Sequence, residues 1–254
     1  MVPATNTKLG LSACVLMLIG LCSVAVRAEL VGPMLVLDVT NGHGSGQLVI
    51  PANPNWYDPK DGSWHWQLPE PAQIHNPHNG AWLATLSECT VTVLEDPQVN
   101  LAFSVLAGDG NTLFQISTAL LPLAPPYTSA EGRASAAFTI TDGDSNGALL
   151  TGHGGAGGNK SYLAQYNGHV PNGTSFAEEI ESLSAPPDGT GNVAVNVPLS
   201  GYLPIAGTVH NMSAGVDFIL SGNDLASGTT NFEIIPEPAA FALALLGGVL
   251  LRRR

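Results

Sequence analysis

The feature that most constrains the fold of this chain is an alternation of apolar and small polar residues. From about residue 88 onward, apolar side chains occupy every second position, and Ser, Thr, Ala, Gln or Asn fill most positions between them. Residues 101–105, 114–120, 134–140, 193–197 and 212–220 follow this pattern. A period of two places the apolar side chains on one face of an extended strand. Each segment therefore predicts a β-strand with one buried and one solvated face.

Turn sequences separate these segments, namely GDGN at 108–111, DGDSNG at 142–147 and SGND at 221–224. Gly, Asn and Asp readily adopt turn conformations. Strands with one solvated face and close turns form antiparallel sheets. We therefore expect an all-β fold over residues 88–235, an antiparallel β-sandwich of jelly-roll or immunoglobulin-like type. One short helix is expected at 176–183 (FAEEIESL), where apolar residues recur at a helical spacing.

Residues 29–87 have a different composition. Residues 34–40 and 47–50 read as strands, whereas residues 51–80 are rich in Pro, Asn, Trp and His. This Pro/Trp-rich region predicts either a long ordered loop over the sandwich or a small subdomain. In both cases residues 29–87 would be an extension of the β domain.

Charge restricts the partners of this domain. Between Glu29 and Ile235 there are three basic and nineteen acidic residues, a net charge of −16. Such a surface repels phosphate backbones, which excludes nucleic acid, and it also repels anionic lipid headgroups. Divalent cations, basic partners and neutral glycans are compatible ligands.

The N-terminus predicts a secretory signal peptide. Lys8 provides a positive charge, residues 9–26 are apolar, and small residues at Val26 and Ala28 suit a cleavage site between Ala28 and Glu29. The remaining cysteine of the mature domain, Cys89, has no partner for an internal disulfide and predicts a small buried side chain.

The C-terminus predicts a short membrane anchor. Pro236-Glu237-Pro238 precedes thirteen apolar residues, 239–251, and Arg252, Arg253 and Arg254 end the chain. A helix of that length spans about 20 Å, less than the roughly 30 Å hydrocarbon core. The arginines would stay on the cytoplasmic side, with the domain outside. We therefore expect a transmembrane helix that is only a transient anchor, and short apolar helices at both chain ends.

This tail resembles the PEP-CTERM sorting signal of Gram-negative bacteria in its Pro-Glu-Pro motif, short apolar helix and basic end. The resemblance covers about nineteen residues. It implies recognition by a membrane-embedded exosortase, cleavage near Pro236, Glu237 and Pro238, and delivery to the cell surface or extracellular matrix. The region from about residue 96 is also similar to domains of PEP-CTERM proteins of uncharacterised function.

Three tryptophans are candidates for glycan binding: Trp56, Trp64 and Trp66. Exposed aromatic rings stack on sugars, and an extended segment would place Trp64 and Trp66 on one face. Large aromatic side chains are more often buried, however. The favoured interpretation is therefore a small core that holds the Pro-rich segment against the sandwich.

A candidate calcium site lies at Asp142, Asp144 and Asn146. Their D-x-D-x-N-G spacing matches the first half of a calcium-binding loop. The twelfth position is His153, where such a loop requires a bidentate Glu. A hairpin turn explains these residues more simply, so at most weak calcium binding is expected, and no other cofactor.

No motif predicts a catalytic residue, since the chain contains neither a G-x-S-x-G nucleophile elbow nor a phosphate-binding loop. The leading hypothesis is a noncatalytic exported protein of the cell envelope or extracellular matrix, with a structural, adhesive or interaction role. A carbohydrate-binding module for exopolysaccharide is the alternative, and a glycan-active hydrolase is a third. The expected partners are an exosortase, exopolysaccharide or other matrix proteins, and the membrane before processing.

Overall fold

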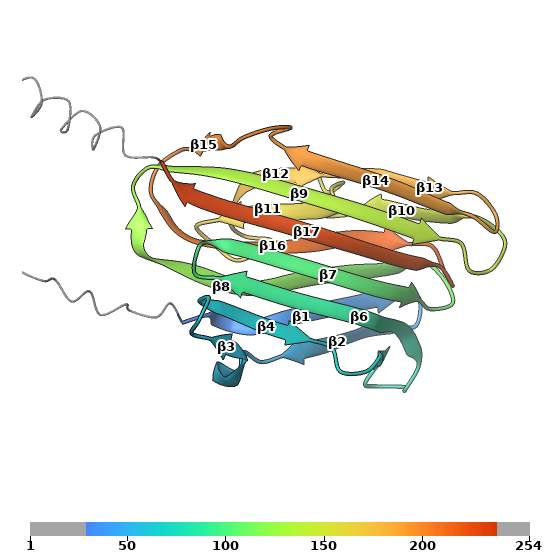
Figure 1. Ribbon diagram of the computed structural model, residues 1–254. Helices are drawn as coiled ribbons and strands as arrows, with labels where there is room; N and C mark the ends of the chain where they lie inside the picture. The colour runs from blue at the N-terminus through green and yellow to red at the C-terminus, as the bar shows by residue number, and fades with distance from the viewer. Residues whose placement is uncertain (1–28, 238–254) are drawn as a thin grey trace, which may run out of the picture.

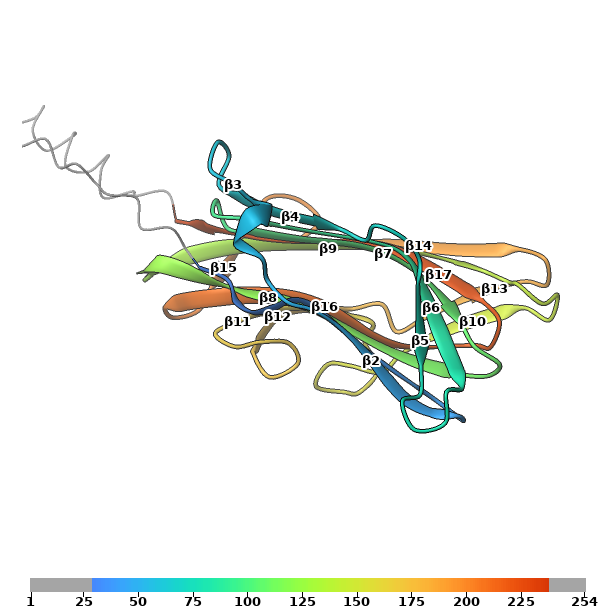
Figure 2. The ribbon, with the colours of Figure 1, turned by 90° about the horizontal axis from the view of Figure 1, so that it is seen from below.

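The computed structural model describes residues 29–237, which form two stacked antiparallel sheets (Figures 1 and 2). The expected all-β sandwich is confirmed. No helix in the described range is long and apolar enough to cross a membrane. The expected signal peptide at 1–28, the apolar helix at 239–251, Pro238 and the three terminal arginines lie outside the described residues.

Sheet A contains eight strands in the described range, in the order β12-β11-β16-β8-β1-β2, and β10 joins β16 to β13. Its strands are β1 (Val31–Asn41), β2 (Gly44–Ile50), β8 (Thr112–Tyr127), β10 (Ala148–Gly152), β11 (Tyr162–Tyr166), β12 (Thr174–Glu179), β13 (Ser182–Ala185) and β16 (Val209–Leu220).

Sheet B contains nine described strands in the order β14-β9-β17-β7-β6-β4-β3, with β15 on β9 and β5 on β6. Its strands are β3 (Tyr57–Asp58), β4 (Ser63–Gln67), β5 (Ala72–His75), β6 (Trp82–Leu94), β7 (Gln98–Ala107), β9 (Ala130–Thr141), β14 (Thr190–Val197), β15 (Leu203–Ile205) and β17 (Leu225–Pro236). A 3-10 turn, η1 (Pro54–Trp56), precedes β3.

The core lies between the sheets and follows the sequence alternation. Phe103 and Phe138 of sheet B both contact Phe218 of sheet A, which also stacks on Phe114 in its own sheet, and the centroids of Phe103 and Phe218 are 5.9 Å apart. Gly228 pairs with both Phe103 and Phe138 in the strands on either side of β17. A Cβ atom at Gly228 would approach both rings to 2.7 Å. The absent side chain therefore provides the space that the two rings occupy.

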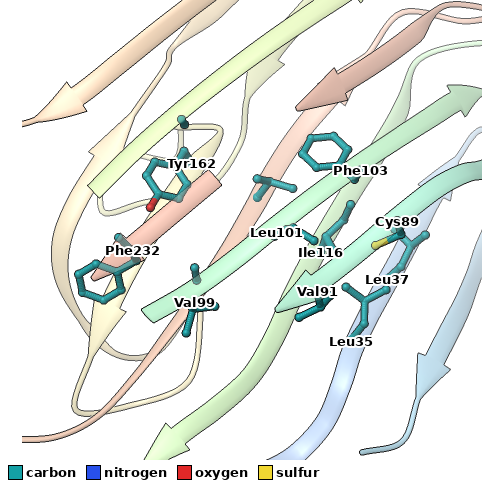
Figure 3. Packing of buried hydrophobic residues seen from close by; sticks show 14 of the residues in the cluster. Leu35, Leu37, Cys89, Val91, Val99, Leu101, Phe103, Ile116, Tyr162 and Phe232 are labelled. Carbon is teal, nitrogen blue, oxygen red and sulfur yellow. The ribbon is translucent and has the colours of Figure 1, made fainter. Parts of the chain in front are cut away.

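A hydrogen bond also joins the sheets. Tyr162 of β11 is fully buried, and its hydroxyl donates to the carbonyl of Asn231 in β17 at 2.7 Å. Figure 3 shows Tyr162 in the core near Phe232. Burial raises the pKa of Tyr162 well above its usual range. The hydroxyl therefore stays protonated and serves as a donor.

The prediction of a loop or separate subdomain at 51–80 is not confirmed. Residues 57–58, 63–67 and 72–75 form β3, β4 and β5 of sheet B, and β6 crosses the expected boundary at residue 87. The physical reason is that buried and exposed residues alternate over a short stretch of this Pro-rich segment. Trp64 and Trp66 point inward whereas the residues between and after them are exposed.

The helix expected at 176–183 is wrong. The segment forms the end of β12 and the start of β13, and Ile180 between them has a φ of 65°. An eight-residue helix is marginal without tertiary support. Here the strands gain pairing with β11 and β10, and the ring of Phe176 stacks on Phe232 at 5.3 Å.

Replacement of Gly228 by Ala is expected to destabilise the fold, because the new methyl group overlaps two packed rings. We expect a loss of about 1–3 kcal/mol and a fall in Tm of roughly 2–10 °C, measured by thermal unfolding. Gly42→Ala is the matched control, since nothing lies within 4 Å of a Cβ atom at Gly42. Equal melting temperatures for the two variants would contradict the packing described here.

Candidate functional site

In Figure 1 the outer face of sheet B is turned toward the viewer, and no other strand lies in front of β9, β17 and β7. Because opposite residues of paired strands point to the same side, the register defines rows that cross β14, β9, β17, β7 and β6. The first, the amide row, consists of Asn196, Ser135, Asn231, Asn100 and Thr92. The second, the alanine row, consists of Ala194, Ala137, Thr229, Ala102 and Thr90. The third, the serine row, consists of Asn192, Thr139, Ser227, Ser104 and Glu88.

Two open grooves run along these rows. One has a volume of about 340 Å³ and lies over the amide and alanine rows. The other, of about 670 Å³, lies over the alanine and serine rows. Both include Thr90, Ala102, Ala137 and Thr229, so the alanine row is their shared floor. Five strands at about 4.8 Å spacing give this floor a length of about 19 Å.

The face is nearly uncharged. The amide and alanine rows contain no ionisable side chain, and Glu88 stands at the end of the serine row. One step beyond the amide row, Arg133 and Glu233 form an ion pair at 2.6 Å, and the Tyr202 hydroxyl donates to Glu233. The net charge of −16 is therefore carried almost entirely by other surfaces.

Hydrogen bonds fix the orientation of the central amides. The side-chain nitrogen of Asn231 donates to the side-chain oxygen of Asn100 at 2.7 Å, and Gln98 donates to the same oxygen at 3.3 Å. The side-chain nitrogen of Asn100, a donor, and the side-chain oxygen of Asn231, an acceptor, take no part in this bond. His65 contacts Thr92 at 3.0 Å and extends the row onto β4.

The tryptophans lie elsewhere and are packed. Trp64 and Trp66 are 3% and 6% exposed, and Trp56 is half-buried. Tyr57 lies 4.7 Å from Trp64, and Trp56 lies 6.2 Å from Trp66, measured between ring centroids. Trp64 borders a hollow of about 310 Å³ with Leu30 and Pro54, but so little of its ring is exposed that stacking on a sugar is not available. The geometry therefore favours the packing interpretation of this cluster.

The acidic turn between β9 and β10 gathers a different set of residues from the one expected. One oxygen each of Asp142, Asp144 and Asp224 lie within 4.8 Å of one another. Asn146 instead donates its backbone N–H to Asp142. Asp224 comes from the β16–β17 turn, and 81 residues separate it from its hydrogen-bond donor Gly143. No local spacing could indicate such a neighbour.

The buried carboxylates of this turn hold its backbone. Asp142 accepts from the N–H groups of Gly147 and Asp188, and Asp224 accepts from Gly143 and from the Ser221 hydroxyl. Burial acts to raise the pKa of Asp142, but the backbone hydrogen bonds outweigh it and lower the pKa from its ordinary value. These contacts are those of a structural turn.

A histidine–aspartate pair lies on the outer face of sheet A. His153 contacts Asp217 at 2.9 Å through Nδ1, and Gln115 donates to the other carboxylate oxygen at 3.0 Å. An aspartate can orient a histidine as a general base in this way. The adjacent Ser161 is fully buried, however, and cannot meet a substrate. This pair had no sequence signal, because its members are 64 residues apart.

Acid titration tests the role of Asp142. Because the pKa of Asp142 in the folded protein is lowered from its ordinary value, the carboxylate stabilises the fold above about pH 4, near the ordinary pKa of Asp. It loses this contribution as the pH falls through the folded value. We expect Asp142→Asn to lower the free energy of unfolding at pH 7 and to flatten its decline between about pH 4 and 2. Urea unfolding across this range measures both effects. Asp144→Asn, in an exposed position of the same turn, is the control, and parallel pH profiles for wild type and Asp142→Asn would refute the assignment.

Comparisons with known proteins do not assign a family. No protein-family model matches the chain, and no curated protein matches it. The enzymatically active domain of bacteriophage CBA120 tailspike protein 4 is similar at 10% identity and a TM-score of 0.22, over 72% of this chain and 21% of that one. The chain thus spans about a fifth of the tailspike chain. The D431N mutant VP2 protein of infectious bursal disease virus gives 10% identity and a TM-score of 0.09, over 84% of this chain and 62% of that one. Similarities of this size do not indicate function.

Proposed function

We propose that this protein is a noncatalytic component of the cell envelope or extracellular matrix that binds a neutral, hydroxyl-rich polymer such as exopolysaccharide. The outer face of sheet B is the proposed binding surface. One observation carries the proposal: two grooves lined by hydroxyl, amide and methyl groups, with Glu88 the one charged residue in their lining, cross a nearly uncharged face of a domain with a net charge of −16. A neutral polymer meets no electrostatic barrier on such a face.

The chemistry of the rows suits a polyol. Hydroxyl and amide side chains both donate and accept hydrogen bonds, as sugar hydroxyls do. The small residues of the alanine row let a polymer approach the sheet closely, while Asn100 and Asn231 present oriented polar groups beside it. Individual contacts of this kind are weak, so binding strength would come from a long polymer and from many copies of the protein.

This surface replaces the tryptophans in the proposal of glycan binding. Stacking on Trp64 or Trp66 needs an exposed ring, and both rings are buried. The alternative of a glycan-active hydrolase is less well supported, because neither Ser161 nor Cys89 is an accessible nucleophile. Ser161 is fully buried beside Asp217, and burial raises the pKa of the Cys89 thiol to about 12.

Export and sorting remain part of the proposal on the strength of the PEP-CTERM resemblance. Pro236 is the last residue of β17, and the N–H of Glu237 donates to the carbonyl of Ser129 at 3.2 Å. The motif thus begins where the sandwich ends. Cleavage by an exosortase near Pro238 would leave every described strand intact. In Figure 1, β1 begins and β17 ends at the same end of the sandwich, away from the centre of the proposed face.

Retention on matrix polysaccharide tests the proposed function. Ala137→Glu places a charged side chain on the groove floor at an exposed position of β9. We expect it to reduce retention at least about tenfold, because the carboxylate fills the groove and must be desolvated beneath the polymer. The probe is the neutral exopolysaccharide fraction of the source cells, immobilised on beads.

Leu149→Glu is the matched control, since Leu149 is 50% exposed on β10 of sheet A and the change introduces the same charge. We expect it to be retained like the wild type. If wild type is not retained, or if both variants are retained equally, the outer face of sheet B is not a polysaccharide-binding surface.

A further inference from the structure

Strand β14 forms an edge of sheet B and carries no charged side chain, although charge is a usual means of protecting an edge. It extends over eight residues, and its side chains alternate between exposed and half-buried positions without interruption. No Asp, Glu, Lys or Arg occurs between Gly189 and Val216, a stretch that includes β14 and β15. An extended, uncharged edge presents unpaired backbone groups and readily pairs with another strand.

The other edges of the described sandwich are protected. Edge strand β12 of sheet A carries Glu178 and Glu179. At the far edge of sheet B, β3 is only two residues long. Edge strand β2 packs against β5, where a Cβ atom at Gly46 would lie 2.6 Å from the carbonyl oxygen of His75. Charge, short length and covering are the devices that prevent edge pairing, and β14 has none of them over residues 192–197.

Exposed apolar side chains lie on the same edge. Leu199, which follows β14, is 91% exposed, and Leu203 of β15 is 41% exposed. Leu199 also lines a hollow of about 210 Å³ with Arg133 and Asn196. Apolar side chains at the margin of an unpaired strand are typical of a surface that another chain covers.

We propose that a second copy of this chain pairs with β14, with the two β14 strands antiparallel and centred on Ala194. Charge favours this location for self-association. Residues 29–235 of each copy carry a net charge of −16, so two copies approach most easily along an edge without Asp, Glu, Lys or Arg. Strand β13 of sheet A packs against β14, and a Cβ atom at Gly191 would lie 2.1 Å from the carbonyl oxygen of Ser184. The proposed pairing therefore uses residues 192–197, beyond that contact.

The pairing would extend the candidate binding face. Centring on Ala194 places Asn192 opposite Asn196 of the second copy and aligns the alanine rows of both copies on one side of a continuous sheet. Ten strands at about 4.8 Å spacing give a shared floor of about 43 Å. This consequence rests on the proposed function, whereas the pairing itself does not.

Sedimentation of the purified protein tests the pairing without any glycan. At about 0.15 M salt, where surface charges are screened beyond roughly 8 Å, we expect the wild type to form a dimer. Asn192→Asp combined with Asn196→Asp places like charges opposite each other with little change in shape. We expect this variant to dissociate at least about tenfold more readily.

A charge-swapped partner makes the test specific. Asn192→Lys combined with Asn196→Lys is also expected to be monomeric alone, and an equimolar mixture of the Asp and Lys variants is expected to restore the dimer. Restoration excludes misfolding as the cause of dissociation. A monomeric wild type at about 100 µM, well above the Kd of a stable homodimer, or a mixture that stays monomeric, would overturn the proposal.

Discussion

The contact on which the whole structure depends is the meeting of four phenylalanine rings between the sheets. Phe103 and Phe138 from sheet B pack on Phe218 from sheet A, which stacks on Phe114, and Gly228 leaves the space that Phe103 and Phe138 fill. Side chains alternate along every strand, so fixing these rings inward fixes all their neighbours outward. A shift of one residue in β7, β8, β9 or β16 would turn one of these rings toward the outer face. The register of both sheets follows from this constraint.

The candidate binding face is the other consequence of the same register. Once the apolar positions point inward, the remaining positions of β9, β17, β7 and β6 contain Ser, Thr, Asn and Ala, aligned in rows by strand pairing. The central rows carry no charge although the domain is strongly acidic. The Arg133–Glu233 pair closes one side of the face and neutralises its own charge. An open, neutral, hydrogen-bonding surface is what remains.

The sequence was sufficient to predict the all-β class and most central strands, because alternation is a local signal and residues 101–105 or 134–140 carry it plainly. The helix predicted at 176–183 was wrong. The apolar residues there have a helical spacing, but the segment pairs with β11 and β10, and this pairing cannot be read from local sequence. The outer face of sheet B could not be predicted, since its rows join residues such as Asn100 and Asn231 that are 131 positions apart. For the same reason the sequence could not indicate that Asp224 lies beside the acidic turn, because it is 81 residues from Gly143. The burial of Trp64 and Trp66 agrees with the usual behaviour of large aromatic side chains.

The central claim is that a neutral polysaccharide lies on the outer face of sheet B, and side-chain amide NMR tests it most directly. The reporters are the amides of Asn100 and Asn231, which lie on that face, and of Gln115, which is bonded to Asp217 on sheet A. The account predicts that titration with neutral exopolysaccharide fragments shifts the Asn100 and Asn231 resonances and leaves Gln115 unchanged. Shifts confined to Gln115, or no shift at saturating polysaccharide, would contradict it.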